Sequence, residues 1–176
     1  MIIILPTNYR EFIYKRTYSR WLEKEQRREE WNETVDRWEE FFESKIPEGL
    51  ESDFYEAIDG IRNFESMPSM RSIWTAGEAL EFDNICGYNC AYTIVEKPKD
   101  FAEILYILMN GTGVGFSTER QYVNRLPEVP EEFDELGYTI EVKDSKQGWA
   151  EAFYSLLENL YFGNLVKIDY SQVRPK

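Results

Sequence analysis

The chain has 176 residues, of which 43% are hydrophobic and 16% aromatic, so it can bury the core of one globular domain. Its formal net charge of -13 disfavours nucleic acid and anionic membrane surfaces as partners. The absence of histidine excludes histidine-based acid–base chemistry, and the two cysteines, Cys86 and Cys90, are too few for a structural zinc site held by this chain alone.

The chain begins with a short apolar run, residues 1–5, which stops at Pro6. This run lacks the length and the basic flank of a signal peptide, and no later apolar run reaches the about 20 residues of a membrane span. Two close cysteines are also not a secreted disulfide framework. We therefore expect a cytoplasmic protein.

Helical spacing of aromatic residues predicts one long helix over residues 8–44. The mixed-charge run 23–30 lies inside this segment and is interpreted as its solvated face. Pro47 and Gly49 end the segment, and a shorter helix is expected at 53–63.

Short strands and helices alternate after residue 67. Strands are predicted at 88–95, 114–118 (with an extension to 123 left open), 138–142 and 166–170. Asp100 is the predicted N-cap of one helix, which ends at Asn110-Gly111, and Asp144 or Ser145 is the predicted N-cap of another, which ends before Gly163. The second helix is expected to turn Trp149, Phe153, Leu156 and Leu160 inward, and an acidic loop at 127–135 separates the two halves. This order predicts parallel strands joined by helical crossovers.

Cys90 lies within a predicted strand, and Cys86 precedes it near Gly87. Two interpretations are open for each thiol: a small buried side chain, or a reactive group. A redox role would need a second thiol, and a C-x-x-x-C pair across a turn is a weak signal for one.

The glycine-rich stretch 111–117 follows a helix and leads into a strand, which is the reverse of the order in a dinucleotide-binding turn. It is interpreted either as the C-terminus of a helix followed by a strand against which another element packs tightly, or as a place where a ligand approaches the backbone. Arg120 and Arg125 are either surface ion-pair partners or phosphate-binding groups.

Taken in order, these stretches resemble the monomeric class II, adenosylcobalamin-dependent ribonucleoside-triphosphate reductases. The resemblance extends along nearly the whole chain, and the matching stretches are 12–22, 67–77, 88–90, 104–117, 119–123, 144–150 and 169–175. The resemblance implies an α/β fold, with a helical N-terminal region at 1–66. The first strands and helices of a ten-stranded α/β barrel follow at 67–176, and this barrel is incomplete.

Enzymes of this family reduce ribonucleoside triphosphates at the 2′ carbon by thiyl-radical chemistry, and a pair of thiols supplies the electrons. By resemblance, Cys90 is one member of that pair and Cys86 is structural. The resemblance also implies that Ser72, Asn89 and Gly113 lie near the substrate. A segment at 118–127 would help bind a deoxynucleotide effector, with Arg120 and Arg125 as phosphate contacts.

The family's radical cysteine, its second reducing cysteine and most of its adenosylcobalamin-binding residues lie beyond position 176. We therefore expect no metal site in this chain and no activity of the chain alone. The expected partners are the remaining C-terminal part of the reductase and thioredoxin or a similar dithiol. The alternative is a non-catalytic nucleotide-binding or interaction fragment that associates with an intact reductase.

Overall fold

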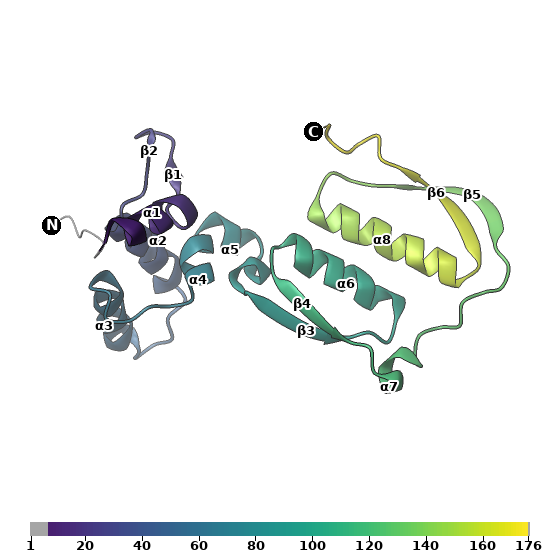
Figure 1. The fold of residues 1–176 in the computed structure, drawn as a ribbon, viewed down its shortest axis with the longest axis horizontal. Helices are drawn as coiled ribbons and strands as arrows, with labels where there is room; N and C mark the ends of the chain where they lie inside the picture. The colour runs from purple at the N-terminus through teal and green to yellow at the C-terminus, as the bar shows by residue number, and fades with distance from the viewer. Residues whose placement is uncertain (1–6, 176) are drawn as a thin grey trace. The chain divides into compact units, whose positions relative to one another are not determined.

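The computed structural model describes residues 7–175, so the expectation about residues 1–5 lies outside the described residues. The chain divides into two compact units, residues 1–88 and 89–176, and each is described by itself (Figure 1). None of the helices in the described range is long and apolar enough to cross a membrane.

The first unit is predominantly helical. Its elements are α1 (Asn8–Thr17), β1 (Trp21–Leu22), β2 (Arg27–Arg28), α2 (Trp31–Glu43), α3 (Glu51–Arg62), α4 (Met70–Thr75), α5 (Glu78–Phe82) and the 3-10 helix η1 (Asn84–Gly87). The helix predicted at 53–63 is confirmed as α3. The helical region predicted before residue 67 is also confirmed, but it is broken between α1 and α2.

The prediction of a single helix over 8–44 is wrong, because a small antiparallel hairpin separates α1 from α2. β1 pairs with β2, and Gln26 in the connecting turn has a positive φ of 52°. The mixed-charge run is therefore a hairpin and not a helix face. Its residues carry no apolar stripe that could pack a third helical segment against the core, so the aromatic residues on either side form two separate helices.

One member of the charged run, Glu29, is buried and not solvated, with 3% of its surface exposed. Arg37 pairs with both of its carboxylate oxygens, Nε to Oε1 at 2.8 Å and Nη2 to Oε2 at 3.0 Å. Thr34 Oγ1 and the backbone N–H of Arg20 also donate to Oε2. Burial alone would raise the pKa of Glu29, but the hydrogen bonds and positive charge of Arg37 outweigh it and hold the pKa below its ordinary value.

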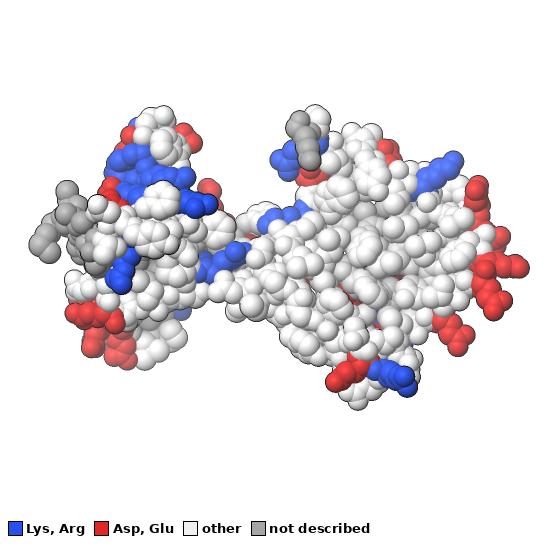
Figure 2. All heavy atoms as spheres, in the orientation of Figure 1, with Lys and Arg blue, Asp and Glu red and all other residues white. Residues whose placement is uncertain are grey.

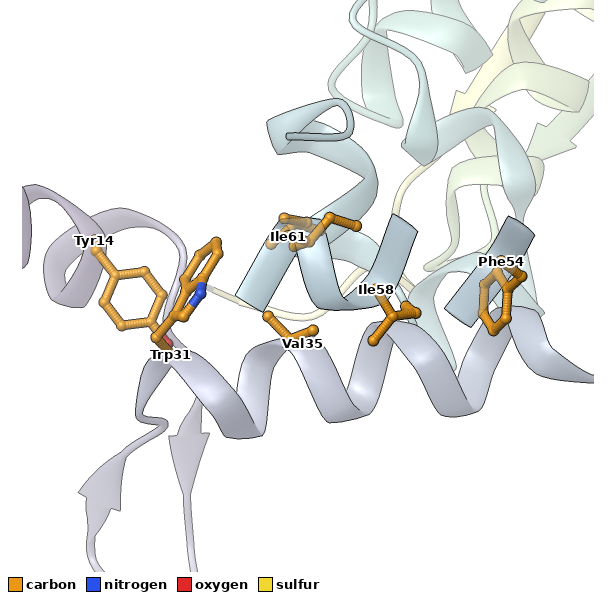
Figure 3. Close-up of a cluster of buried hydrophobic side chains, with 7 residues drawn as sticks. Tyr14, Trp31, Val35, Phe54, Ile58 and Ile61 are labelled. Carbon is orange, nitrogen blue, oxygen red and sulfur yellow. The ribbon is translucent and has the colours of Figure 1, made fainter. Parts of the chain in front are cut away.

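The core of the first unit lies between α1, α2 and α3. Figure 3 shows its buried side chains, which are Tyr14, Trp31, Val35, Phe54, Ile58, Ile61 and Ile73. The rings of Tyr14 and Trp31 meet edge to face at 5.5 Å. The Tyr14 hydroxyl forms a 2.6 Å hydrogen bond with that of Thr34, and burial raises the pKa of Tyr14 to about 12. The predicted aromatic positions thus form a core, although on two helices.

The second unit consists of two strand–helix–strand segments. Its elements are β3 (Cys90–Ile94), α6 (Pro98–Met109), β4 (Gly113–Ser117), α7 (Arg120–Val123), β5 (Asp134–Glu141), α8 (Lys146–Tyr161) and β6 (Asn164–Asp169). β3 pairs with β4 and β5 pairs with β6, both in parallel (Figure 1). The predicted parallel strands with helical crossovers are confirmed.

Side chains fix where the two crossover helices begin. The N-cap of α6 is Lys97, three residues before the predicted cap Asp100, whose carboxylate instead accepts the backbone N–H groups of Glu96 and Lys97 from within the first turn. Ser145 Oγ accepts the N–H of Gly148 and is the N-cap of α8. Gly111 follows α6 with a positive φ of 82°, as expected at a helix end.

Three local predictions in the second unit need correction. The strand at 113–117 does not extend to 123, because residues 120–123 form the short helix α7. β5 begins at Asp134 and so includes residues that were assigned to the acidic loop. Trp149 is not inward: it stays exposed and packs on Tyr170 at 5.8 Å between ring centroids.

The inward face of α8 is shifted relative to the predicted stripe. Gly148 and Ala152 are its buried residues, and Leu156 packs on the cluster of Ile140 and Val142. A Cβ atom at Gly148 would lie 2.6 Å from the Lys143 backbone oxygen. Gly148 therefore lets the helix approach the backbone just after β5 closely, and the larger Trp149 lies at the surface.

The division into compact units falls after Tyr88, later than the predicted domain boundary after residue 66. α4 belongs to the first unit because Arg37 of α2 donates to the backbone oxygens of Ile73 and Ala76, at 3.0 and 2.8 Å. A division by compactness does not test a boundary defined by resemblance to the barrel, so that boundary stays a prediction.

Candidate functional site

The β3–β4 pair places three of the predicted site residues side by side. Cys90 is the first residue of β3 and is paired in register with Gly113, the first residue of β4. The N–H of Gly113 donates to the backbone oxygen of Asn89 at 2.9 Å. Cys90 is exposed, and its thiol is free. A thiol held at the start of a hydrogen-bonded strand has a fixed position, which redox chemistry on a bound substrate requires.

The face of this strand pair that carries Cys90 is open at its first two residue pairs within the second unit. Side chains alternate between the faces of a sheet, so Cys90 and Tyr92 share one face with their partners Gly113 and Gly115. All four residues are exposed. The intervening residues of both strands point to the other face, where α6 crosses from β3 to β4 (Figure 1).

Neither glycine opposite these side chains is required by the chain's own backbone or packing. Neither is among the glycines with positive φ. A Cβ atom at Gly113 would lie 3.6 Å from the backbone oxygen of Asn89, and one at Gly115 would lie 3.6 Å from Tyr92 Cδ2. Both distances are ordinary contacts. Glycine in a strand often marks a place where a ligand or another backbone comes close, and the two glycines leave room for such an approach on this face.

Cys86 lies in a different environment from Cys90. It belongs to η1 in the first unit, is buried, and donates its S–H to the backbone oxygen of Ala79 at 3.4 Å. A buried thiol with a local hydrogen-bond partner is the pattern of a structural cysteine. Its structural role nevertheless stays a prediction, as does the redox role of Cys90.

Ser72 lies in the first unit, on α4. Its hydroxyl accepts a hydrogen bond from Trp38 Nε1 at 2.9 Å, and its side chain is half-buried. The hydroxyl therefore already has a partner within the helical unit, and a substrate contact through Ser72 stays a prediction.

Of the two arginines of the segment 118–127, Arg120 is the first residue of α7 and Arg125 lies just after its end, and both are exposed. Arg125 Nη1 pairs with Glu96 Oε2 at 2.5 Å, and its guanidinium lies 5.8 Å from the ring centroid of Tyr122. Among the described residues, no carboxylate forms an ion pair with Arg120. Of the two, Arg120 thus has the guanidinium that is available to an anion, whereas an anion at Arg125 would compete with Glu96.

Sequence reasoning missed Tyr92 and Gly115, which extend the face of Cys90. The signal was present, because the strand predicted at 88–95 puts Tyr92 two residues after Cys90 and so on the same face. Gly115, by contrast, joins this face only through the parallel register of β3 and β4, which the sequence does not specify.

The N-terminal part of the chain matches a protein-family model. Residues 4–78 match the ribonucleotide reductase alpha domain. This match covers the helical first unit up to the start of α5.

Curated relatives extend the similarity toward the C-terminus. The adenosylcobalamin-dependent ribonucleoside-triphosphate reductase of Lactobacillus helveticus is 28% identical over 69% of the chain. The enzyme of the same name from Levilactobacillus brevis is 29% identical, also over 69% of the chain. The chain spans about a fifth of the length of these relatives, since the matches cover 21% of each.

The fold is shared with a solved structure. The crystal structure of a B12-dependent (class II) ribonucleotide reductase superimposes with a TM-score of 0.74, at 22% identity, over 94% of this chain and 32% of that one. Family model, relatives and fold all show similarity to the ribonucleotide reductases. The relatives are named as adenosylcobalamin-dependent enzymes and the solved structure as a class II enzyme, and the chain matches only a part of each.

Proposed function

We propose that this chain is the N-terminal part of an enzyme that converts ribonucleoside triphosphates to 2′-deoxyribonucleoside triphosphates, with Cys90 as one of its two reducing thiols. The placement of Cys90 carries this proposal. Its free thiol is exposed at the start of β3, next to the backbone of Gly113, on a face that the second unit leaves open. A ribose can approach that sulfur closely because the neighbouring position has no side chain.

The proposed reaction needs a second thiol. Two thiols lose two electrons and two protons as they form a disulfide, and the ribonucleotide loses its 2′ hydroxyl as water. Cys86 does not suit this role, because it is buried and bonded to the Ala79 carbonyl. The second thiol and the radical-forming cysteine are therefore assigned to the remaining C-terminal part of the reductase. A thioredoxin-like dithiol would reduce the disulfide after each turnover.

Adenosylcobalamin is the cofactor proposed for the assembled enzyme, in which it generates the radical. We assign its binding mainly to the remaining part of the enzyme, because the chain spans only about a fifth of the length of its adenosylcobalamin-dependent relatives.

The segment 118–127 is proposed to contribute to a deoxynucleotide effector site. The guanidinium of Arg120, which has no carboxylate partner among the described residues, supports a phosphate contact there. Arg125 would have to exchange Glu96 for phosphate, so effector binding at Arg125 would also release the loop before α6.

Reconstitution tests the proposed function. The chain is mixed with the remaining C-terminal part of the reductase, adenosylcobalamin, a ribonucleoside triphosphate and a dithiol, and deoxynucleotide formation is measured. We expect turnover only when both polypeptides are present. The absence of turnover in the mixture would contradict the enzyme-part proposal and favour a non-catalytic fragment.

Cysteine variants of the same mixture test the assigned thiol. Cys90→Ser should lower multiple turnover with thioredoxin by more than about a hundredfold, because the disulfide can no longer form. Cys86→Ser is the matched control, since serine can still donate to the Ala79 carbonyl, and it should retain most of the activity. Full turnover of Cys90→Ser would refute the role of Cys90.

A further inference from the structure

We propose that Tyr92 is a positioning residue that stacks on the base of the bound ribonucleoside triphosphate, an inference that rests on the proposed function. Tyr92 lies on the face of Cys90, two residues further along β3. Two residues of a strand span about 7 Å. Tyr92 is 69% exposed, so the second unit leaves most of it uncovered.

The glycines opposite Tyr92 and Cys90 leave room for a flat molecule. In the parallel register, Gly113 lies next to Cys90 and Gly115 next to Tyr92. Among the described residues, Tyr92 Cδ2 is the one side-chain atom within 4 Å of a Cβ built at Gly115. The face is therefore a strip of bare backbone on one strand, bordered by a thiol and an aromatic ring on the other.

The charge of this face decides which end of a nucleotide passes over Tyr92. Cys90, Tyr92, Gly113 and Gly115 carry no charge, and the face continues with the uncharged pair Ile94 and Ser117. A triphosphate needs arginine, lysine or a metal ion, so it would not be placed here. The base is the uncharged end, and it is attached to the 1′ carbon, which adjoins the reacting 2′ carbon.

An aromatic ring at this position would hold any of the four bases, because each base has a π face that stacks on an aromatic side chain. Tyr92 would thus fix the position of the nucleotide without selecting among bases. This separates it from Cys90, which reacts, and from Gly113, which provides close approach.

The test compares variants of the reconstituted complex. Tyr92→Ala should raise KM for the ribonucleoside triphosphate about tenfold, with kcat changed less than about threefold, because stacking is lost while the thiols remain. Tyr92→Phe keeps the ring and should restore KM. Tyr9→Ala removes an equally exposed tyrosine from α1 and should leave both constants unchanged.

A second variant separates binding from folding. Gly115→Val introduces a strong strand former and should not lower the thermal stability of the chain, but its branched side chain fills the strip beside Tyr92 and should raise KM. A change in stability without a change in KM would indicate a structural role for this face and overturn the proposal.

Equilibrium dialysis of the complex with a ribonucleoside triphosphate gives the Kd directly and does not require turnover. If the wild-type complex shows no turnover, the proposed function fails, but a tenfold weaker Kd in Tyr92→Ala still supports the contact. An unchanged Kd and KM in Tyr92→Ala overturn it. A fall in kcat alone also overturns it, because Tyr92 would then contact polypeptide and not the nucleotide.

Discussion

The two cysteines lie only four positions apart in sequence but differ in their access to solvent. Cys90 begins a strand whose open face exposes its thiol, whereas Cys86 ends a turn that packs its thiol against the Ala79 carbonyl. Spacing alone could not distinguish these environments, because a C-x-x-x-C pair fits either case. The difference comes from the change at Tyr88, where the 3-10 helix gives way to extended backbone.

This difference predicts selective alkylation of the folded chain. With iodoacetamide at neutral pH, Cys90 should react about tenfold or more faster than Cys86, because only an accessible thiolate reacts. Peptide mass spectrometry after a timed quench measures both rates. In denaturant the two rates should converge, and Cys90→Ser should then show a single slow site in the folded state. Equal rates in the folded state would contradict the buried position of Cys86.

At the scale of elements, the ion pair of Glu29 and Arg37 joins the hairpin to two helices. Glu29 follows β2, Arg37 lies on α2, and the same guanidinium donates to the Ile73 backbone oxygen of α4. Glu29 also accepts hydrogen bonds at its backbone oxygen from Ser19 and Lys15 at the end of α1. Removal of one partner would leave a buried charge without compensation.

We therefore expect Glu29→Gln to lower the free energy of unfolding at pH 7 by about 2–4 kcal/mol. The pKa of Glu29 is lower in the folded chain than its unfolded value near 4.5, so its stabilisation is present above about pH 4.5 and is lost as the pH falls through the folded pKa. The difference between wild type and variant should shrink below about pH 4.

Urea unfolding at pH 7 and at about pH 3.5 measures this difference. Glu56→Gln is the matched control, because Glu56 is exposed on α3, and it should change stability by less than about 0.5 kcal/mol at either pH. A pH-independent difference for Glu29→Gln would show that the buried carboxylate does not titrate as proposed.

At the scale of the whole molecule, the second unit contains two parallel strand pairs that remain small sheets among the described residues. Parallel sheets are normally covered on both faces and extended by further strands. Exposed apolar side chains lie on both pairs, including Tyr92 and Phe116 on one and Leu136 and Tyr138 on the other. Figure 2 shows that uncharged side chains cover most of the visible face of this unit.

These open sheets predict self-association of the chain when it is alone. Unpaired strand edges beside apolar surface are a template for further pairing. Sedimentation velocity at increasing concentration should show oligomers, and addition of the remaining C-terminal part should replace them with one defined complex. Leu136→Lys, which places a charge on β5, should shift the isolated chain toward the monomer. A monomer at high concentration would contradict this prediction.

The sequence by itself determined the alternation of strands and crossover helices in the second unit and the aromatic core of the first. Both depend on local periodicity, and Tyr14, Trp31 and Val35 pack as their spacing indicates. The same periodicity wrongly predicted that the first helix continues through residues 18–30. A run of charged residues has no hydrophobic period, so it does not distinguish a solvated helix from a hairpin.

Only the tertiary structure decided that Glu29 is buried, that Trp149 is exposed, and that Gly115 lies beside Tyr92. Each outcome depends on contacts between residues far apart in sequence: Glu29 with Arg37, Gly148 with the backbone at Lys143, and β3 with β4. Such contacts are set by how whole elements approach one another. The free energy that stabilises these contacts comes from side-chain packing and strand pairing across the fold. Neither can be predicted from a local pattern of residues.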